Sequence, residues 1–155
     1  MTSRKSNLDN LVDAGLLKVH IAKPDELKTH IQSAEDRLKD ASIANISKTG
    51  KFSSLYDASH SLCIAATKMY GYRPGDDKGH RQGLFSIIDQ VVPAASNIQP
   101  ILIIAHRTRN LMEYDGNLPD MQDSQLEAMQ SAAANLMEEV IFIYKKWLKE
   151  NFESK

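Results

Sequence analysis

Apolar residues recur along this chain at spacings of three and four, which is the period of amphipathic helices. No stretch has the strict alternation of apolar and polar residues that predicts a strand. The pattern therefore predicts an all-α protein with a short leading helix and about five longer helices. Their expected ranges are Asn7–Ala14, Pro24–Ala41, Leu55–Met69, Leu84–Val91, Ile98–Tyr114 and Ser124–Asn151.

Local sequence signals predict where these helices begin and end. Pro24 suits a first helical turn. The segment "SKTGKFSS" predicts a turn in which Ser53 or Ser54 caps the following helix. Glycines follow three of the predicted helices, as is common just past a helix C-terminus: Gly15, Gly71 and Gly116. We expect these helices to form a bundle with mostly antiparallel neighbours.

Composition and charge narrow the class of protein. The chain has 155 residues, of which 42% are hydrophobic and 25% charged, and this suits one globular domain over residues 1–155. We expect the ends of the chain, residues 1–6 and 152–155, to be flexible. Nineteen basic and twenty acidic residues give a net charge of -1. Binding to nucleic acid would therefore require a local basic patch.

The cysteine content and the absence of long apolar runs bear on the compartment. Cys63 stands in an apolar stretch, which favours a buried small hydrophobe over a nucleophile. A single cysteine forms no intramolecular disulfide, and the first residues lack the apolar segment of a signal peptide. No run approaches the ~18 apolar residues of a membrane span. We therefore expect a cytoplasmic protein without a membrane partner.

The chain lacks the common motifs of phosphate-binding loops and metal sites. It contains no Gly-rich loop ending in Lys-Ser or Lys-Thr, no Cys-x-x-Cys pair and no His-Glu-x-x-His. The histidines are scattered, without other ligand types at supporting positions: His20, His30, His60, His80 and His106. We expect neither a metal nor a cofactor.

Basic residues fall in two groups. One surrounds the Gly-rich loop and comprises Arg73, Lys78, His80 and Arg81; the other comprises His106, Arg107 and Arg109. In an antiparallel bundle, a loop before one helix and the far end of the next helix can meet at the same end. The two groups thus predict a phosphate- or RNA-binding patch built from Arg73, His80, Arg81, His106 and Arg107. An ordinary basic rim is the competing interpretation.

The stretch "HRTRNLMEYDG", residues 106–116, is either a solvated helix end or a site. Arg109 and Glu113 are four residues apart and can pair along the helix surface. Asn110 and Tyr114 share a different face. Arg109 and Tyr114 are five apart, which places them roughly 140° from each other around a helix. They converge only at a kink, at a frayed end or across a symmetric dimer.

The phrase "RNLMEY" within this stretch resembles the helix signature of HEPN domains (higher eukaryotes and prokaryotes nucleotide-binding). The stretches "LVDAGLLK", "KFSSLYDASHSLCIAATKMYGYRP" and "GHRQGLF" are similar to an uncharacterised bacterial branch of that family. The likeness covers most of residues 8–115. It implies a small all-α protein that is usually dimeric. Many members are metal-independent ribonucleases of toxin–antitoxin and defence systems.

The resemblance also implies particular site residues. The family motif is an Arg, a polar residue after it, and a His after four to six intervening positions. Arg109 and Asn110 match the first two, and Tyr114 stands in place of the His, so the implied catalytic set is Arg109, Asn110 and Tyr114. Histidine, with a pKa near 6.5, suits proton transfer at neutral pH better than tyrosine, near 10. His106 or His80 are candidates for the missing imidazole.

Two functions follow from the resemblance. The first is a HEPN-type ribonuclease or toxin-like component, with Arg109, Asn110 and Tyr114 meeting their symmetry mates in the groove of a homodimer. The second is a catalytically inactive relative that binds RNA, a nucleotide or a cognate toxin or antitoxin protein, such as a small nucleotidyltransferase. A helical adaptor without a chemical site is a third interpretation, because a fold does not determine a function.

Overall fold

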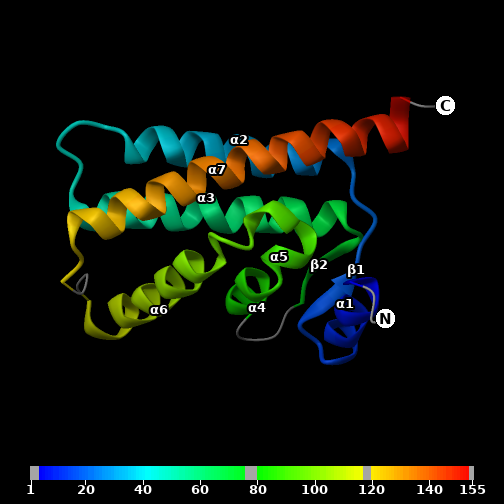
Figure 1. Cartoon of the computed structure of the whole chain (residues 1–155), viewed down its shortest axis with the longest axis horizontal. Coiled ribbons are helices and arrows are strands. Elements are labelled where there is room, and N and C mark those ends of the chain that lie inside the picture. Colours follow the sequence, from blue (N-terminus) through cyan, green and yellow to red (C-terminus); the bar gives the residue numbers. More distant parts are fainter. Residues whose placement is uncertain (1–3, 76–79, 117–119, 154–155) are drawn as a thin grey trace.

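The computed structural model describes residues 4–75, 80–116 and 120–153, with side chains described for 7–75, 83–114, 116 and 120–152. It is a mostly all-α bundle, as predicted (Figure 1). The elements are α1 (Arg4–Asp13), β1 (Leu17–Val19), α2 (Pro24–Ala41), α3 (Lys48–Met69), β2 (Tyr72–Pro74), α4 (His80–Ser86), α5 (Ile88–Val91), the 3-10 turn η1 (Pro93–Ala95), α6 (Gln99–Asp115), α7 (Asp123–Leu148) and the π turn η2 (Lys149–Glu153).

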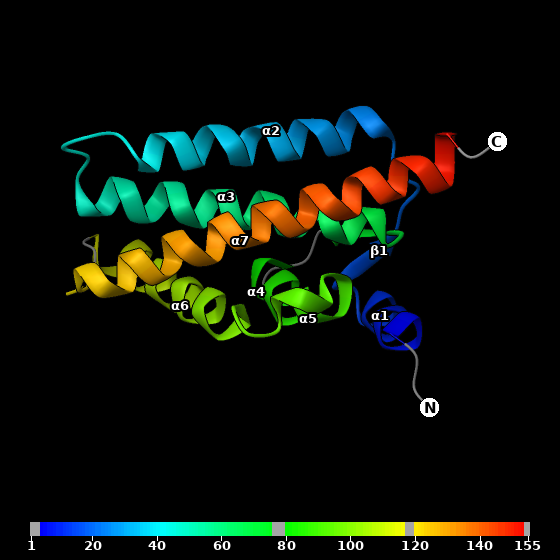
Figure 2. The same cartoon turned by 45° about the horizontal axis from the view of Figure 1, so that its top comes forward.

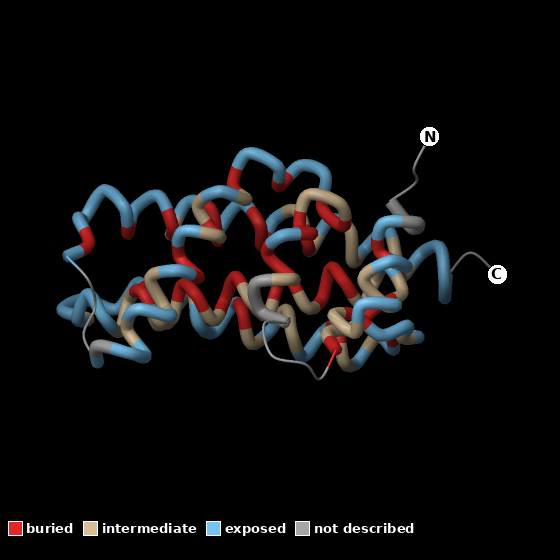
Figure 3. Tube along the Cα trace, turned by 90° about the horizontal axis from the view of Figure 1, so that it is seen from below, coloured by how far each residue is buried: buried red, intermediate tan, exposed pale blue. Residues whose placement is uncertain are grey.

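Helix α3 is the centre of the molecule. The long helices α2 and α7 pack against α3 and against each other, and α4, α5 and α6 pack on the opposite side of α3 (Figures 1 and 2). Side chains on most faces of α3 are buried, which is the pattern of a helix enclosed by neighbours. The largest buried side chains include Phe52, Tyr56 and Phe85, and buried residues lie along the middle of the molecule (Figure 3).

Several predicted helix ends are confirmed because the signals there are local. Pro24 occupies the first turn of α2, followed by two acidic residues that favour the positive end of the helix dipole. Gly15, Gly71 and Gly116 have positive φ angles of 81°, 104° and 75°, a backbone region that glycine enters without a Cβ clash. Gly116 ends α6, and its N–H donates to the carbonyl of Met112.

Two short strands accompany the helices. β1 and β2 form an antiparallel pair in which Leu17 faces Pro74 and Val19 faces Tyr72. Each strand has three residues, too few to show an alternation of apolar and polar positions. The pair ties the start of the chain to the end of α3, and the N–H of Gly75 extends it by donating to the carbonyl of Leu16.

Two helix boundaries also differ from the prediction. The segment expected to be a turn is helical: α3 begins at Lys48, and Ser47, not Ser53 or Ser54, caps it by accepting the N–H of Gly50. The helix expected over Leu84–Val91 is broken at Ile87 into α4 and α5. The side chain of Gln99 explains this break, because its amide donates to the carbonyls of Phe85 and Ser86, which a continuous helix would pair internally.

The two ends of the chain were expected to be flexible. Residues 4–6 belong to α1, and residues 152–153 belong to η2. Residues 1–3 and 154–155 lie outside the described part of the chain. None of the helices described for this chain is long and apolar enough to span a membrane.

Candidate functional site

The residues of the stretch 106–116 lie on α6, which packs on α3, α4 and α7. Leu102 and Ala105 are buried and lie on the inner face of α6. His106 and Arg109 follow on the same inner side, because residues three and four apart share a helix face. Two polar residues of this stretch, His106 and Arg109, therefore contact α3.

His106 is buried, with 9% of its surface exposed. Its Nδ1 lies 3.0 Å from the hydroxyl of Tyr56 on α3, and its ring meets the ring of Phe85 edge-on at 6.0 Å between centroids. Its Nε2 lies 3.4 Å from the side-chain nitrogen of Asn110. The imidazole is therefore part of the core, and the role of His106 in binding phosphate or RNA stays a prediction.

Arg109 is largely covered, with 27% of its side chain exposed. Its Nη1 lies 3.6 Å from Oδ1 of Asp57 on α3, and its Nε lies 3.5 Å from Oε1 of Glu113. The guanidinium carbon stands 5.0 Å from the ring centroid of Tyr56, within range of a cation–π contact. The predicted pairing with Glu113 is confirmed. The contacts with Tyr56 and Asp57 come from another helix and have no signal in the sequence around Arg109.

We call this group the Arg109 cluster: His106, Arg109 and Asn110 of α6 with Tyr56 and Asp57 of α3. Nη1 of Arg109 is buried and has no hydrogen-bond partner among the residues that the structure describes. Its ion pair with Asp57 is longer than a hydrogen bond. Because Asp57 and Glu113 are 43% and 65% exposed, both carboxylates can swing away toward water. The cluster can therefore offer a guanidinium and an amide to an anionic group.

Tyr114 and Arg107 lie elsewhere on α6. Tyr114 is 88% exposed, and Arg107 is also exposed. Helix α6 runs without a break from Gln99 to Asp115, so Tyr114 stays about 140° from Arg109 around the axis. Within one chain, Asn110 contacts His106, and Arg109 and His106 both contact Tyr56.

Of the residues predicted to form one basic patch, the structure describes the side chains of Arg73, His106 and Arg107, so the joint patch stays a prediction. Arg73 lies on β2, and its guanidinium donates to the carbonyl of Pro74. The views in Figures 1 and 2 place the β1–β2 pair at the opposite end of the molecule from the last turn of α6. The side chains of His80 and Arg81, and the whole of Lys78, lie outside the described residues. His80 begins α4, which packs beside α6.

A second cluster of titratable side chains joins the start of α2 to the end of α3. Oε1 of Glu26 lies 2.6 Å from Nε2 of His20 and 3.0 Å from Nζ of Lys68, which is also 3.0 Å from Nε2 of His30. Burial alone would raise the pKa of Glu26, but hydrogen bonds from His20 and Lys68, together with the charge of Lys68, lower this pKa to about 2. Burial, and then the charge of Lys68, lower the pKa of His30.

Cys63 is buried, as predicted, and burial raises the pKa of its thiol. In the part of the chain that the structure describes, no group of three or more His, Cys, Asp or Glu side chains is placed to hold a metal ion.

Fold and site together define a small helical bundle with an arginine–histidine cluster between its third and sixth helices. No protein-family model, no curated protein and no solved structure matches this chain.

Proposed function

We propose that this chain is a HEPN-like protein that binds RNA or a nucleotide through the Arg109 cluster. The observation that carries the proposal is the adjacency of Arg109, Asn110 and an imidazole. The side-chain nitrogen of Asn110 lies 3.4 Å from Nε2 of His106. Arginine recognises phosphate through several N–H donors, and an amide adds neutral hydrogen bonds. A role in a toxin–antitoxin or defence system follows from the resemblance in sequence, and it belongs to the same proposal.

Metal-independent RNA cleavage is the reaction that such a cluster would carry out. The 2′-oxygen attacks the neighbouring phosphorus, the bond from phosphorus to the 5′-oxygen breaks, and a 2′,3′-cyclic phosphate and a 5′-hydroxyl result. The proton of the 2′-hydroxyl goes to a base, and the leaving oxygen takes up a proton. Arg109 would stabilise the charge on phosphorus. His106 supplies the imidazole, one turn before Arg109 on the same face of α6.

A catalytically inactive, regulatory relative is the second candidate, and a specific observation favours it. Both nitrogens of the His106 ring have neighbours in the core, namely Tyr56 and Asn110. A buried imidazole in contact with side chains at both nitrogens is a poor proton shuttle for an external substrate. The exposed Tyr114 does not share its face with Arg109. In this candidate the Arg109 cluster binds its ligand without chemistry.

The outer face of α6 supports a homodimer. Ile104, Leu111 and Tyr114 are 53%, 50% and 88% exposed, and their spacings of seven and three residues are those of a helix–helix seam. In such a dimer Tyr114 lies at the interface, while Arg109 remains in its own bundle beside Tyr56. Light scattering of the wild type and of Leu111→Glu tests this, since the variant should be monomeric at concentrations where the wild type pairs.

Cleavage is tested with labelled single-stranded RNA in the presence of a chelator. The variants are Arg109→Ala, Arg109→Lys and His106→Gln, and Arg37→Ala serves as the control because Arg37 is an exposed, ion-paired arginine on α2. The proposal expects weaker RNA or nucleotide binding by Arg109→Ala, partial retention by Arg109→Lys, and no change in the control.

Three outcomes separate the candidates. Cleavage that disappears in Arg109→Ala and His106→Gln supports the ribonuclease. Binding without cleavage, weakened only by the Arg109 substitutions, supports the inactive relative. Wild type that binds neither RNA nor nucleotide at low salt contradicts both.

A further inference from the structure

The last two turns of α7 continue beyond the core of the bundle. The buried residues of α7 end at Val140. None of the described residues from Ile141 to Leu148 is fully buried. Ile141, Tyr144 and Trp147 still pack partly against the core, so the helix remains anchored. The opposite side of these turns faces solvent, at the end of the molecule away from the last turn of α6 (Figure 1).

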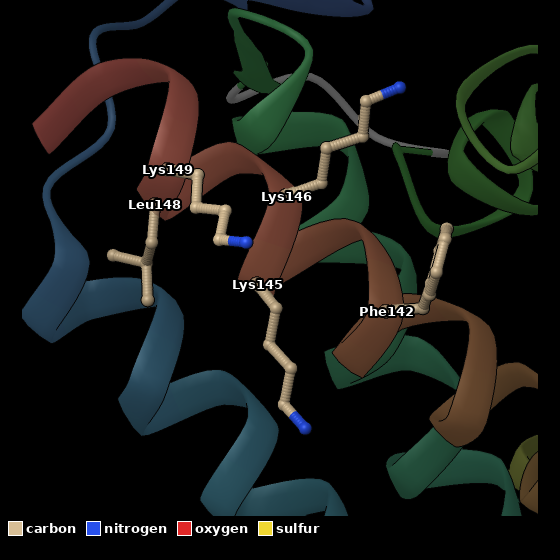
Figure 4. A pocket seen from close by; sticks show the side chains of 5 residues that line it. All are labelled: Phe142, Lys145, Lys146, Leu148 and Lys149. Carbon is tan, nitrogen blue, oxygen red and sulfur yellow. The ribbon is translucent and has the colours of Figure 1, made fainter. Parts of the chain in front are cut away.

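One face of this extension combines an aromatic ring with lysines. Phe142, Lys145, Lys146 and Lys149 follow at spacings of three, four and seven from Phe142, which places them on a single helix face. Together with Leu148 they line a hollow of about 510 Å³. Figure 4 shows the side chains of these residues extending from α7, with the amines of Lys145 and Lys146 pointing in different directions. We call these four residues the α7 patch.

The charges of the α7 patch are only partly balanced. Lys146 pairs with Glu150 at 4.0 Å. Lys145 and Lys149 form no ion pair among the residues that the structure describes, although Glu138 lies one turn before Phe142 on the same face. Lysines near a helix C-terminus are favoured by the helix dipole, which accounts for part of this charge. The dipole does not account for Phe142, which is 67% exposed between these lysines.

We propose that the α7 patch binds single-stranded RNA, with Lys145 and Lys149 on phosphates and a base stacked on Phe142. Sequence-tolerant binding of single strands combines lysine or arginine contacts to the backbone with aromatic rings on which bases stack. The patch has both parts on one exposed face of α7, and its positive charge complements RNA although the whole chain is nearly neutral. This inference rests on the proposed function and adds a second contact surface, remote from the Arg109 cluster.

The test measures the binding of a fluorescent oligouridine strand by anisotropy over a range of salt concentrations. Lys145→Gln combined with Lys149→Gln should weaken binding about tenfold at low salt. It should also reduce the slope of log affinity against log salt by about 1.4, which is about 0.7 for each lost phosphate contact. Phe142→Ala should weaken binding by about fivefold or more with little change in that slope.

A matched control removes the same charge elsewhere. Arg37→Gln combined with Lys39→Gln removes two exposed positive charges near the C-terminal end of α2. This double variant should leave the affinity for RNA and its salt dependence unchanged. All substituted side chains in both sets are exposed, so circular dichroism and thermal midpoints should match the wild type.

Each outcome decides for or against the α7 patch. If the α7 variants bind as the wild type does and Arg109→Ala binds more weakly, the α7 patch is overturned and the proposed function stands. If the α7 variants weaken binding and Arg109→Ala does not, the α7 patch stands and the Arg109 cluster is excluded as the site. Binding to phosphatidylserine vesicles that the α7 variants abolish, without RNA binding by the wild type, would overturn the RNA assignment.

Discussion

Asp57→Asn is the substitution that tests the Arg109 cluster most sharply. Asp57 on α3 holds Nη1 of Arg109 at 3.6 Å, and an asparagine has the same shape without the charge. A phosphate that approaches Arg109 in the wild type must compete with this carboxylate. We therefore expect Asp57→Asn to raise the affinity for RNA or nucleotide.

The size of this gain in affinity follows from how exposed the Arg109–Asp57 ion pair is. Two unit charges 3.6 Å apart attract by about 1 kcal/mol in a water-like dielectric. Because Asp57 is 43% exposed, solvent screens the pair, and comparable surface pairs contribute about 0.2–1 kcal/mol in double-mutant cycles. The expected gain in affinity is therefore between about 1.4-fold and about fivefold.

The same substitution should slightly destabilise the fold. It removes an ion pair that contributes at most about 1 kcal/mol, which corresponds to a fall in thermal midpoint of about 2–4 °C for a chain of this size. Tighter binding with lower stability is the signature of a ligand that competes with Asp57. A nonspecific loss of structure would lower both quantities.

Anisotropy titrations of labelled RNA, with parallel thermal melts, give both quantities. Glu113→Gln is the matched control: Glu113 also pairs with Arg109 but is 65% exposed, so its effect should be smaller. In an Arg109→Ala background, Asp57→Asn should change the affinity very little. Unchanged or weaker binding by Asp57→Asn with Arg109 present, in a protein that melts normally, would refute the competition between Asp57 and phosphate.

Further predictions concern stability. Tyr56→Phe removes the hydrogen bond to His106 while keeping the ring, and it should cost about 1 kcal/mol in the free energy of unfolding, measured by urea titration. Glu26→Gln should destabilise the protein at pH 7 by about 1 kcal/mol, well below the roughly 3 kcal/mol that the pKa shift alone would give, because the side chain is partly in solvent. The depressed pKa makes this contribution fully present above pH 4.5, so the difference between wild type and Glu26→Gln should shrink as pH falls toward 2; a constant difference would contradict the network. Gly75→Ala should lower the thermal midpoint, because a Cβ there would lie 2.3 Å from a backbone carbonyl oxygen. Gly83→Ala in α4 is the contrasting case: a Cβ there would have no atom within 4 Å, so the midpoint should be equal or higher.

The parts of the fold predicted from sequence depend on local signals. Helical periodicity located most of the long helices, and Pro24, Gly71 and Gly116 marked ends because proline and glycine act on the backbone at their own positions. The β1–β2 pair was not predictable in this way, since its register joins Leu17 to Pro74 across the whole of α2 and α3. The break at Ile87 likewise depends on a side chain twelve residues later in the chain.

In the candidate site, too, contacts within one helix were predictable from the sequence and contacts between helices were not. The pairing of Arg109 with Glu113 follows from a spacing of four residues on one helix and was predictable. The burial of His106 was not, because Tyr56 lies fifty residues earlier and meets it only through the packing of α6 on α3.

The most direct test of the central claim is a titration of the isotope-labelled protein with a nucleotide, followed by NMR. The account predicts that the Nε–H signal of Arg109 and the side-chain amide of Asn110 shift saturably, together with backbone signals around Tyr56 and Asp57. In Arg109→Lys, the shifts of the Asn110 amide and of the backbone signals around Tyr56 and Asp57 should be smaller. Saturable shifts confined to other parts of the molecule, with the Arg109 and Asn110 signals unchanged, would contradict the assignment of the Arg109 cluster as the ligand site.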